Sequence, residues 1–333
     1  LSSAFFLFFP FLFFGPFLLL SPFTSGYDSA VDGTIQQIYI ALRNRDILEF
    51  TPQEQADGLF GATPFRSSDH DPVIIGLDLA STPTVEPVLW FSSDRDNKLT
   101  KAEDIVRYDS NGDFTTIFDG SDVGLRKNNI NAFDIISDTE ILMSFSRFTF
   151  MSDIGSVDES DIVKFTATSL GNTTAGSFEL YVDGSDLGLR TGGENIDALT
   201  RLSDGSLLFS TTGNARLNGG LRAKDEDLIR FDPTSLGETT SGALELYVDG
   251  SDIQLNRNSE DIDAVGIFQD QLLLSTTDRF NVDTVSGRDE DVFGFTPTST
   301  GSTTAGTFDS DLLFDGSVAG FTGDIGAIDL SIG

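Results

Sequence analysis

The sequence predicts an all-β fold built from four repeated units, and three observations support this prediction. An apolar strand signature recurs at Ile130, Ile196, Ile262 and Ile325, at intervals of 66, 66 and 63 residues. Clusters of Gly, Asp, Ser and Thr separate the apolar runs, and no segment of the repeat carries a helical period. Tandem units of four short strands are typical of the blades of a β-propeller.

Each unit contains three landmarks. The first is the strand signature, as in Ile196-Asp197-Ala198-Leu199, and the second is an acidic cluster that leads into a strand, as in Glu226-Asp227-Leu228-Ile229. The third is a strand that ends in Asp-Gly-Ser, where we expect the glycine to supply a left-handed turn residue. It occurs at residues 119–121, 183–185, 249–251 and 315–317.

The phase of the repeat predicts a closed ring. The first unit opens at its second strand, Val88 to Phe91, and the chain ends after one surplus first strand, Asp324 to Ser331. Pairing the surplus strand with the incomplete unit would remove two exposed sheet edges. We therefore expect residues 84–333 to form a four-bladed propeller closed by the C-terminal strand. An open array of blades is the alternative.

This strand pattern resembles that of hemopexin-type four-bladed propellers, whose inner strands direct carbonyl and acidic oxygens at cations in a central channel. The resemblance implies that Asp197, Asp263 and Asn131 supply oxygen ligands to a hard cation, with Ca²⁺ the candidate, and that Gly326 contributes only backbone. The alternative is that these are polar strand ends in a solvated channel. The units are longer than ordinary blades of about 40 to 50 residues. We expect the additional residues, such as Thr211 to Lys224, to form loops on one face.

Two further acidic patterns have a structural and a metal-binding interpretation. One aspartate recurs just before a strand in each unit, and we expect its side chain to bond backbone amides and fix a turn, with a calcium role as the alternative. These residues are Asp104, Asp161, Asp227 and Asp291. Residues 109–113 have the acidic i, i+2, i+4 spacing of a short calcium loop, but they lack a distal Glu and also suit an ordinary turn.

Residues 26–80 lie outside the repeat and contain the only His of the chain. The run Ser68-Asp69-His70-Asp71-Pro72-Val73 leads into an apolar strand. Residues 40–79 resemble the C-terminal end of a secreted bacterial extracellular nuclease of the endonuclease/exonuclease/phosphatase superfamily. The resemblance implies a short fragment of an α/β domain, in which His70 acts as the base or contacts the phosphate and Asp69 is the orienting or metal-linked acid.

The same resemblance implies Mg²⁺ or Mn²⁺ as the cofactor of a complete enzyme and a nucleic acid or other phosphodiester as its partner. The family's metal-ligating Glu and Asp-x-Asn pair lie upstream of the His motif and are absent from this chain. We therefore expect the 333-residue chain to be inactive, because a phosphodiesterase needs its metal-binding acids.

The net charge and the lack of Cys restrict which ligands and sites the chain can have. Lys+Arg 20 against Asp+Glu 53 gives 20 − 53 = −33, which disfavours binding to a nucleic-acid backbone through a basic surface. The chain has no Cys, which excludes disulfides and thiolate sites.

Residues 1–25 are rich in Phe, but Pro10, Gly15 and Pro16 interrupt them, so no stable membrane span is expected. An export or membrane segment and a sequence artefact are the two interpretations of this stretch.

Two functions follow from these observations. The first is the C-terminal portion of a secreted, metal-dependent nuclease or phosphodiesterase with an appended propeller. The alternative is a noncatalytic extracellular binding or adhesion propeller, a candidate for Ca²⁺ binding, that follows a degenerate enzyme remnant. In both cases we expect a secreted monomer. The ligand of the propeller is not predicted, because Asp, Gly, Ser and Thr loops suit carbohydrate, peptide and calcium equally.

Overall fold

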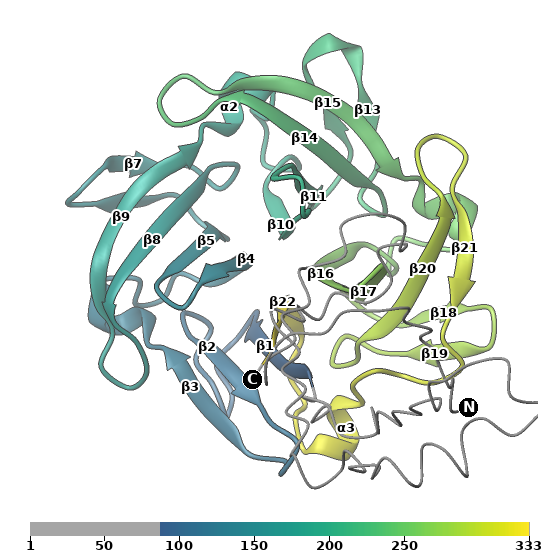
Figure 1. Cartoon of the computed structure of the whole chain (residues 1–333), viewed down its shortest axis with the longest axis horizontal. Helices are drawn as coiled ribbons and strands as arrows, with labels where there is room; N and C mark the ends of the chain where they lie inside the picture. Colours follow the sequence, from purple (N-terminus) through teal and green to yellow (C-terminus); the bar gives the residue numbers. More distant parts are fainter. Residues whose placement is uncertain (1–86, 333) are drawn as a thin grey trace, which may run out of the picture. The chain divides into compact units, whose positions relative to one another are not determined.

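The structure, a computed structural model, describes residues 87–332 and shows four antiparallel sheets arranged around a central axis (Figure 1). Each sheet has four strands and forms one blade of a β-propeller. The prediction of an all-β propeller with four blades is therefore confirmed. The predicted segments 1–25 and 26–80 lie outside the described residues.

The strands of each blade follow one another from the axis to the rim. Blade 1 consists of β22 (Ile325–Ile332), β1 (Pro87–Ser93), β2 (Ile105–Tyr108) and β3 (Phe114–Phe118). Blade 2 consists of β4 (Ile130–Ser137), β5 (Glu140–Phe145), β8 (Ile162–Ser169) and β9 (Ala175–Val182). Blade 3 consists of β10 (Ile196–Arg201), β11 (Leu207–Thr211), β14 (Leu228–Ser235) and β15 (Ser241–Val248). Blade 4 consists of β16 (Ile262–Phe268), β17 (Gln271–Thr276), β20 (Phe293–Ser299) and β21 (Ala305–Phe308).

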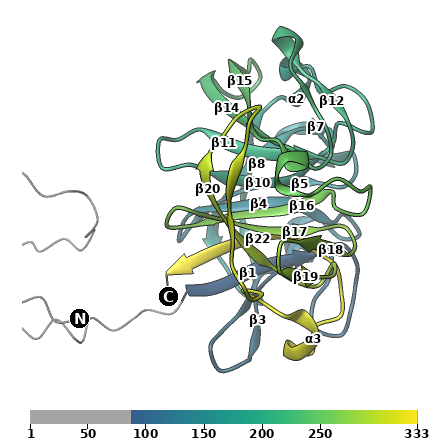
Figure 2. The same cartoon turned by 90° about the vertical axis from the view of Figure 1, so that its right-hand side faces the viewer.

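The C-terminal strand closes the ring as predicted. β22 pairs antiparallel with β1, with Leu330 opposite Leu89 and Ile328 opposite Phe91. Figure 2 shows the yellow β22 beside the dark blue β1, although the two strands lie at opposite ends of the described chain. The surplus strand thus becomes the inner strand of the first blade.

The residues that make each unit longer than an ordinary blade do not form the plain loops that the sequence predicts. Blades 2, 3 and 4 each carry a two-stranded hairpin between their second and third strands. These hairpins are β6 (Thr149–Met151) with β7 (Gly155–Val157), β12 (Ala215–Arg216) with β13 (Arg222–Ala223), and β18 (Phe280–Val282) with β19 (Val285–Gly287). Each buries apolar side chains, such as Met151 and Val157, which the polar composition of the longer segments concealed.

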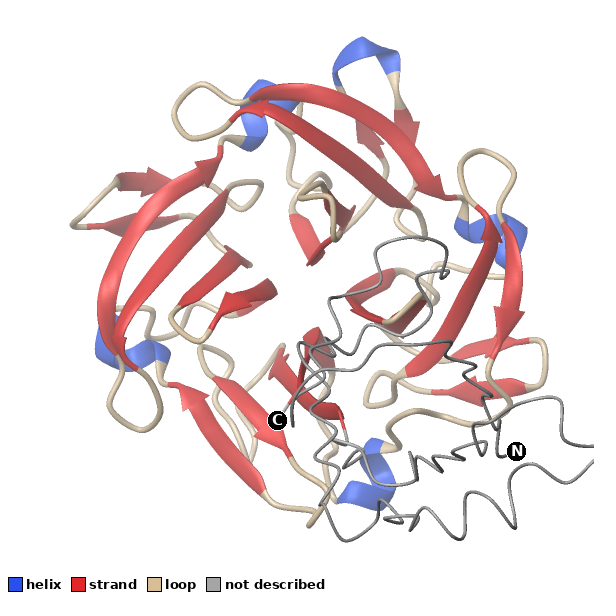
Figure 3. Cartoon of the chain, in the orientation of Figure 1, coloured by secondary structure: helices blue, strands red, loops and turns tan. Residues whose placement is uncertain are grey.

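Short helical turns follow the outer strands (Figure 3). They are η2 (Gly120–Val123), α2 (Gly184–Leu187), η4 (Gly250–Ile253) and α3 (Gly316–Ala319), and a further turn, η3 (Asn218–Gly220), lies in the hairpin of blade 3. No helix among residues 87–332 is long and apolar enough to cross a membrane.

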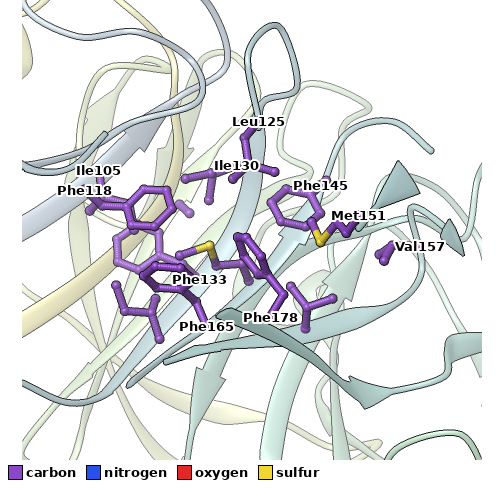
Figure 4. Packing of buried hydrophobic residues seen from close by; sticks show 14 of the residues in the cluster. Ile105, Phe118, Leu125, Ile130, Phe133, Phe145, Met151, Val157, Phe165 and Phe178 are labelled. Atoms are coloured by element: carbon purple, nitrogen blue, oxygen red, sulfur yellow. The ribbon is translucent and has the colours of Figure 1, made fainter. Parts of the chain in front are cut away.

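The hydrophobic core lies between neighbouring blades. The cluster between blades 1 and 2 joins Ile105 and Phe118 to Phe133, Phe145 and Phe165 (Figure 4). The rings of Phe118 and Phe165 meet edge to face, with centroids 5.2 Å apart. Because burial of apolar area drives folding, these contacts hold each blade against the next.

The Asp-Gly-Ser turns need glycine for a different reason from the one predicted. None of the four glycines has a positive φ; the left-handed residue follows the helical turn, as at Gly188 and Gln254. A Cβ on Gly250 would lie only 2.1 Å from the carbonyl oxygen of Glu226. This glycine therefore permits two backbone segments to meet.

The recurring aspartates have the structural role that was expected. Asp227 Oδ1 accepts a hydrogen bond from the Gly250 amide at 2.9 Å, and its Oδ2 accepts one from the Lys224 amide at 2.8 Å. Asp161 and Asp291 repeat both bonds, and Asp104 accepts the one from Gly120. These hydrogen bonds hold each Asp-Gly-Ser turn against the start of the third strand of its blade.

Candidate cation site

Each inner strand contains a β-bulge at the same position of the repeat. In β10, Ile196 pairs with Thr211 and Ala198 pairs with Ser210, so Asp197 is the extra residue. The equivalent residues are Asn131 in β4, Asp263 in β16 and Gly326 in β22. A bulge redirects a side chain and is common beside functional sites. Three of the four bulged residues therefore present oxygen-bearing side chains near the N-terminal ends of the inner strands.

Asp197 is buried against its own blade and the next one. Its Oδ1 lies 2.6 Å from the hydroxyl oxygen of Ser210, within hydrogen-bond distance. The same hydroxyl lies 2.6 Å from the carbonyl oxygen of Ile262, the first residue of β16. Ser210 therefore joins the carboxyl group of blade 3 to the inner strand of blade 4.

Three further buried acids lie around the axis near Asp197. Asp261, Asp263 and Asp324 are 7%, 6% and 8% exposed, and Oδ1 of each carboxyl group is buried without a hydrogen-bond partner. Asp324, Asp197 and Asp261 all lie close enough to Asp263 for their charges to oppose its ionisation. We call Asp197, Asp261, Asp263 and Asp324 the axial acid cluster.

The electrostatics of the axial acid cluster favour protonation or a bound cation. Burial, with the neighbouring carboxylates, raises the pKa of Asp261 to about 9. Burial also raises the pKa of Asp197 to about 8, against the opposing hydrogen bond from Ser210, and that of Asp324 to about 8. The pKa of Asp263 is raised well above its ordinary value, by burial first and then by the charge of Asp324. No ion pair within residues 87–332 involves any of the four.

Asn131 has a separate role. Its side-chain amide donates a hydrogen bond to the carbonyl oxygen of Ile196 at 2.8 Å, which ties β4 to β10. The structure thus brings together two of the three predicted ligands, Asp197 and Asp263, and gives the third an interstrand contact.

Asp261 and Asp324 were not predicted. A sequence signal for them exists, because the residue before each recurring Ile is always Asn or Asp: Asn129, Asn195, Asp261 and Asp324. With the side chains as they stand, no group of three or more acids within residues 87–332 is arranged to hold a metal ion. A bound cation would therefore draw the carboxylates closer together and complete its shell with carbonyl oxygens or water.

A second acidic pair lies further along the inner strands. Asp329 of β22 accepts a hydrogen bond from the Ile135 amide of β4 at 2.6 Å, and Asp134 of β4 accepts one from the Arg201 amide of β10 at 2.7 Å. Arg201 Nε also lies 3.7 Å from Asp134 Oδ2. This pair has backbone donors that link the inner strands, and Asp134 Oδ2, which has no hydrogen-bond partner, has the Arg201 guanidinium beside it.

The other predicted sites are not part of the axial acid cluster. Asp109 Oδ1 accepts hydrogen bonds from the amides of Asn111 and Asp113, as in an ordinary exposed turn. His70 and Asp69 lie outside the described residues, so their predicted roles stay predictions.

A hollow of about 720 Å³ lies at the rim beside β18 and β19. Its lining combines three arginines with three acids: Arg257, Arg279, Arg288, Glu290, Asp291 and Asp315. None of its lining residues belongs to the axial acid cluster, so the hollow is a separate feature.

No protein-family model matches the chain, and no curated protein matches it. The resemblance of residues 40–79 to nucleases therefore has no further support.

Proposed function

We propose that the propeller is a noncatalytic binding module that holds a hard divalent cation, with Ca²⁺ the favoured ion, in the axial acid cluster. The observation that carries this proposal is the buried carboxyl group of Asp263. Its Oδ1 has no partner, and the charges of the neighbouring Asp324, Asp197 and Asp261 oppose its ionisation. Buried carboxylates without a counter-charge are costly, so the cluster takes up either protons or a cation.

The donor chemistry favours Ca²⁺ over the transition metals. The only His of the chain is His70, and the chain has no Cys, so the propeller offers oxygen ligands alone. Ca²⁺ accepts six to eight oxygen ligands in flexible geometry, whereas Mg²⁺ requires a near-ideal octahedron. Irregular donors from bulged strands suit the more tolerant ion.

An extracellular setting is part of the same proposal. The acidic, cysteine-free composition is compatible with an exported protein, and calcium sites of extracellular modules bind at about 10⁻⁴ to 10⁻³ M. A site of that strength would be occupied outside a cell.

Calcium titration by isothermal calorimetry, after treatment with EDTA, tests the proposal. We expect the wild-type chain to bind Ca²⁺ at the axial acid cluster and Asp263→Asn to bind it at least about 10-fold more weakly, because ligand charge tunes calcium affinity. Asn is compatible with this bulge, since Asn131 occupies the equivalent position in β4. Asp138→Asn, at an exposed turn, is the control for loss of one charge.

Two results would contradict the proposal. Absence of binding at millimolar Ca²⁺ would exclude the cation site. Equal affinity of wild type and Asp263→Asn would show that Ca²⁺ binds elsewhere on the acidic surface.

A second proposal concerns the residues before the propeller. The run Ser68-Asp69-His70-Asp71-Pro72-Val73 supports descent of residues 26–80 from the C-terminal end of a secreted metal-dependent nuclease. With Mg²⁺ or Mn²⁺ we expect no cleavage of DNA by the 333-residue chain, because the metal-binding acids of that family are absent from it. Cleavage that disappears in His70→Ala would contradict this. The reading frame upstream of Leu1 would test descent, because in-frame Glu and Asp-x-Asn motifs are expected there.

A further inference from the structure

Three of the four junctions between blades carry the same polar clamp at the rim. At the junction of blades 2 and 3, the Asp183 amide donates to Thr240 Oγ1 at 2.9 Å, and the Thr240 amide donates to Asp186 Oδ2 at 2.9 Å. A backbone bond from Gly237 to Tyr181, also 2.9 Å, completes the clamp. The other two clamps consist of Asp119, Asp122 and Thr174, and of Asp249, Asp252 and Thr304.

The junction of blades 4 and 1, where the ring closes, lacks this clamp. Val318 replaces the second aspartate and is 83% exposed. The loop of blade 1 that would carry the threonine is a short turn closed by Asp109 and Asp113. Aromatic packing joins these two blades instead, with the rings of Tyr108 and Phe314 5.1 Å apart.

Two members of the axial acid cluster lie on the two sides of this junction. Asp263 belongs to β16, the inner strand of blade 4, and Asp324 immediately precedes β22, the closing strand. The Ile325 amide donates to the carbonyl oxygen of Asp289 in blade 4 at 2.9 Å, so β22 begins against that blade. The unpartnered Oδ1 atoms of Asp263 and Asp324 therefore lie where the closing strand meets blade 4.

We infer that the cation bound by the axial acid cluster latches the C-terminal strand, so that closure of the propeller depends on calcium. This inference rests on the proposed function and adds a role to its site. Without a cation, the Oδ1 atoms of Asp263 and Asp324 are buried without a partner at the one junction that has no rim clamp. A divalent cation between the two carboxyl groups would displace their protons and cross-link blade 4 to β22.

Hydrogen–deuterium exchange of the full chain, with 1 mM Ca²⁺ or with EDTA, tests the latch. We expect Ca²⁺ to slow exchange of β22 and β1 by about 2- to 10-fold, because local opening sets the exchange rate and a site of about 10⁻⁴ to 10⁻³ M stabilises the closed strand by that factor at 1 mM. The strands β8 and β9 of blade 2 are the internal reference, and we expect little change there.

Asp324→Asn should abolish the effect of Ca²⁺ on β22, whereas Asp138→Asn should retain it. If Asp324→Asn does not fold, Asp263→Asn tests the same latch without a change next to β22. Failure of the wild-type chain to bind Ca²⁺ would overturn both the proposed function and the latch. Binding with equal protection of all blades, or with no protection of β22, would overturn the latch alone.

Discussion

The hydroxyl oxygen of Ser210 lies 2.6 Å from Oδ1 of Asp197 and equally close to the carbonyl oxygen of Ile262. A hydroxyl group has one proton and a carbonyl group has none to donate, so both contacts are hydrogen bonds only when Asp197 is protonated. This agrees with the pKa of Asp197, which burial raises to about 8. Asp197 therefore favours its protonated form when no cation is bound.

In EDTA, we expect stability to fall as the pH rises from about 5 to about 9. The pKa values of Asp197, Asp261 and Asp324 are raised from 3.8 to about 8, 9 and 8, so the folded state retains protons that the unfolded chain has released. This stability is fully present below the unfolded pKa and is lost as the pH passes the folded pKa. Each retained proton contributes about 1.4 kcal/mol per pH unit.

Thermal melts at several pH values between about 5 and about 9 test whether stability falls as the pH rises. Ca²⁺ should reduce the loss at high pH, because the cation replaces the protons. A melting temperature in EDTA that stays level or rises between pH 5 and pH 9 would contradict the assigned protonation.

Calcium binding should release protons. At pH 7 the raised pKa values leave the axial acid cluster largely protonated, and a carboxyl group must ionise to bind a metal. Calorimetry in two buffers of different ionisation enthalpy measures the number released. We expect at least about one proton per ion. Identical binding enthalpies in the two buffers would exclude this linkage.

Removal of residues 324–333 should strongly destabilise the propeller. The deletion would expose the pairing edge of β1 and leave buried Phe91 and Phe321 without Ile325 and Ile328. Each lost hydrogen bond costs about 1 kcal/mol and each buried aliphatic side chain removed costs about 1.5 to 3 kcal/mol, which together approach the stability of a domain. Circular dichroism melts and light scattering would show a large decrease or aggregation. An unchanged melting temperature would mean that β22 does not close the ring.

Thr240→Val should weaken one rim clamp by about 1 to 2 kcal/mol, because the Asp183 amide loses its acceptor while the side-chain volume stays nearly constant. Chemical denaturation measures the change in free energy of unfolding. Thr239→Val, at the neighbouring exposed position, is the matched control and should change it much less. Equal effects of the two substitutions would argue against the clamp.

The sequence was sufficient to predict the four blades and their closure because both depend on strand order. The intervals between Ile130, Ile196, Ile262 and Ile325 count the blades, and the surplus strand after Asp324 fits the incomplete first unit. Edge pairing leaves few other arrangements for such a pattern.

The site was only partly predictable, because its members depend on tertiary position. Gly326 occupies the bulge of β22, so the strand signature alone assigns no acid to that strand. Asp324 enters the cluster only because β22 returns to the axis beside β16. Likewise, Asn131 shares the repeat position of Asp263 but uses its amide to join β4 to β10.

The most direct test of the cation site is anomalous diffraction from crystals of the chain grown with Tb³⁺, a heavier substitute for Ca²⁺. We expect an anomalous peak on the propeller axis, with carboxylate oxygens of Asp263 and Asp324 at about 2.3 to 2.6 Å and Asp197 or Asp261 beside them. A peak confined to exposed acids such as Asp109 and Asp113, or an axis without any peak at millimolar Tb³⁺, would contradict the proposed site.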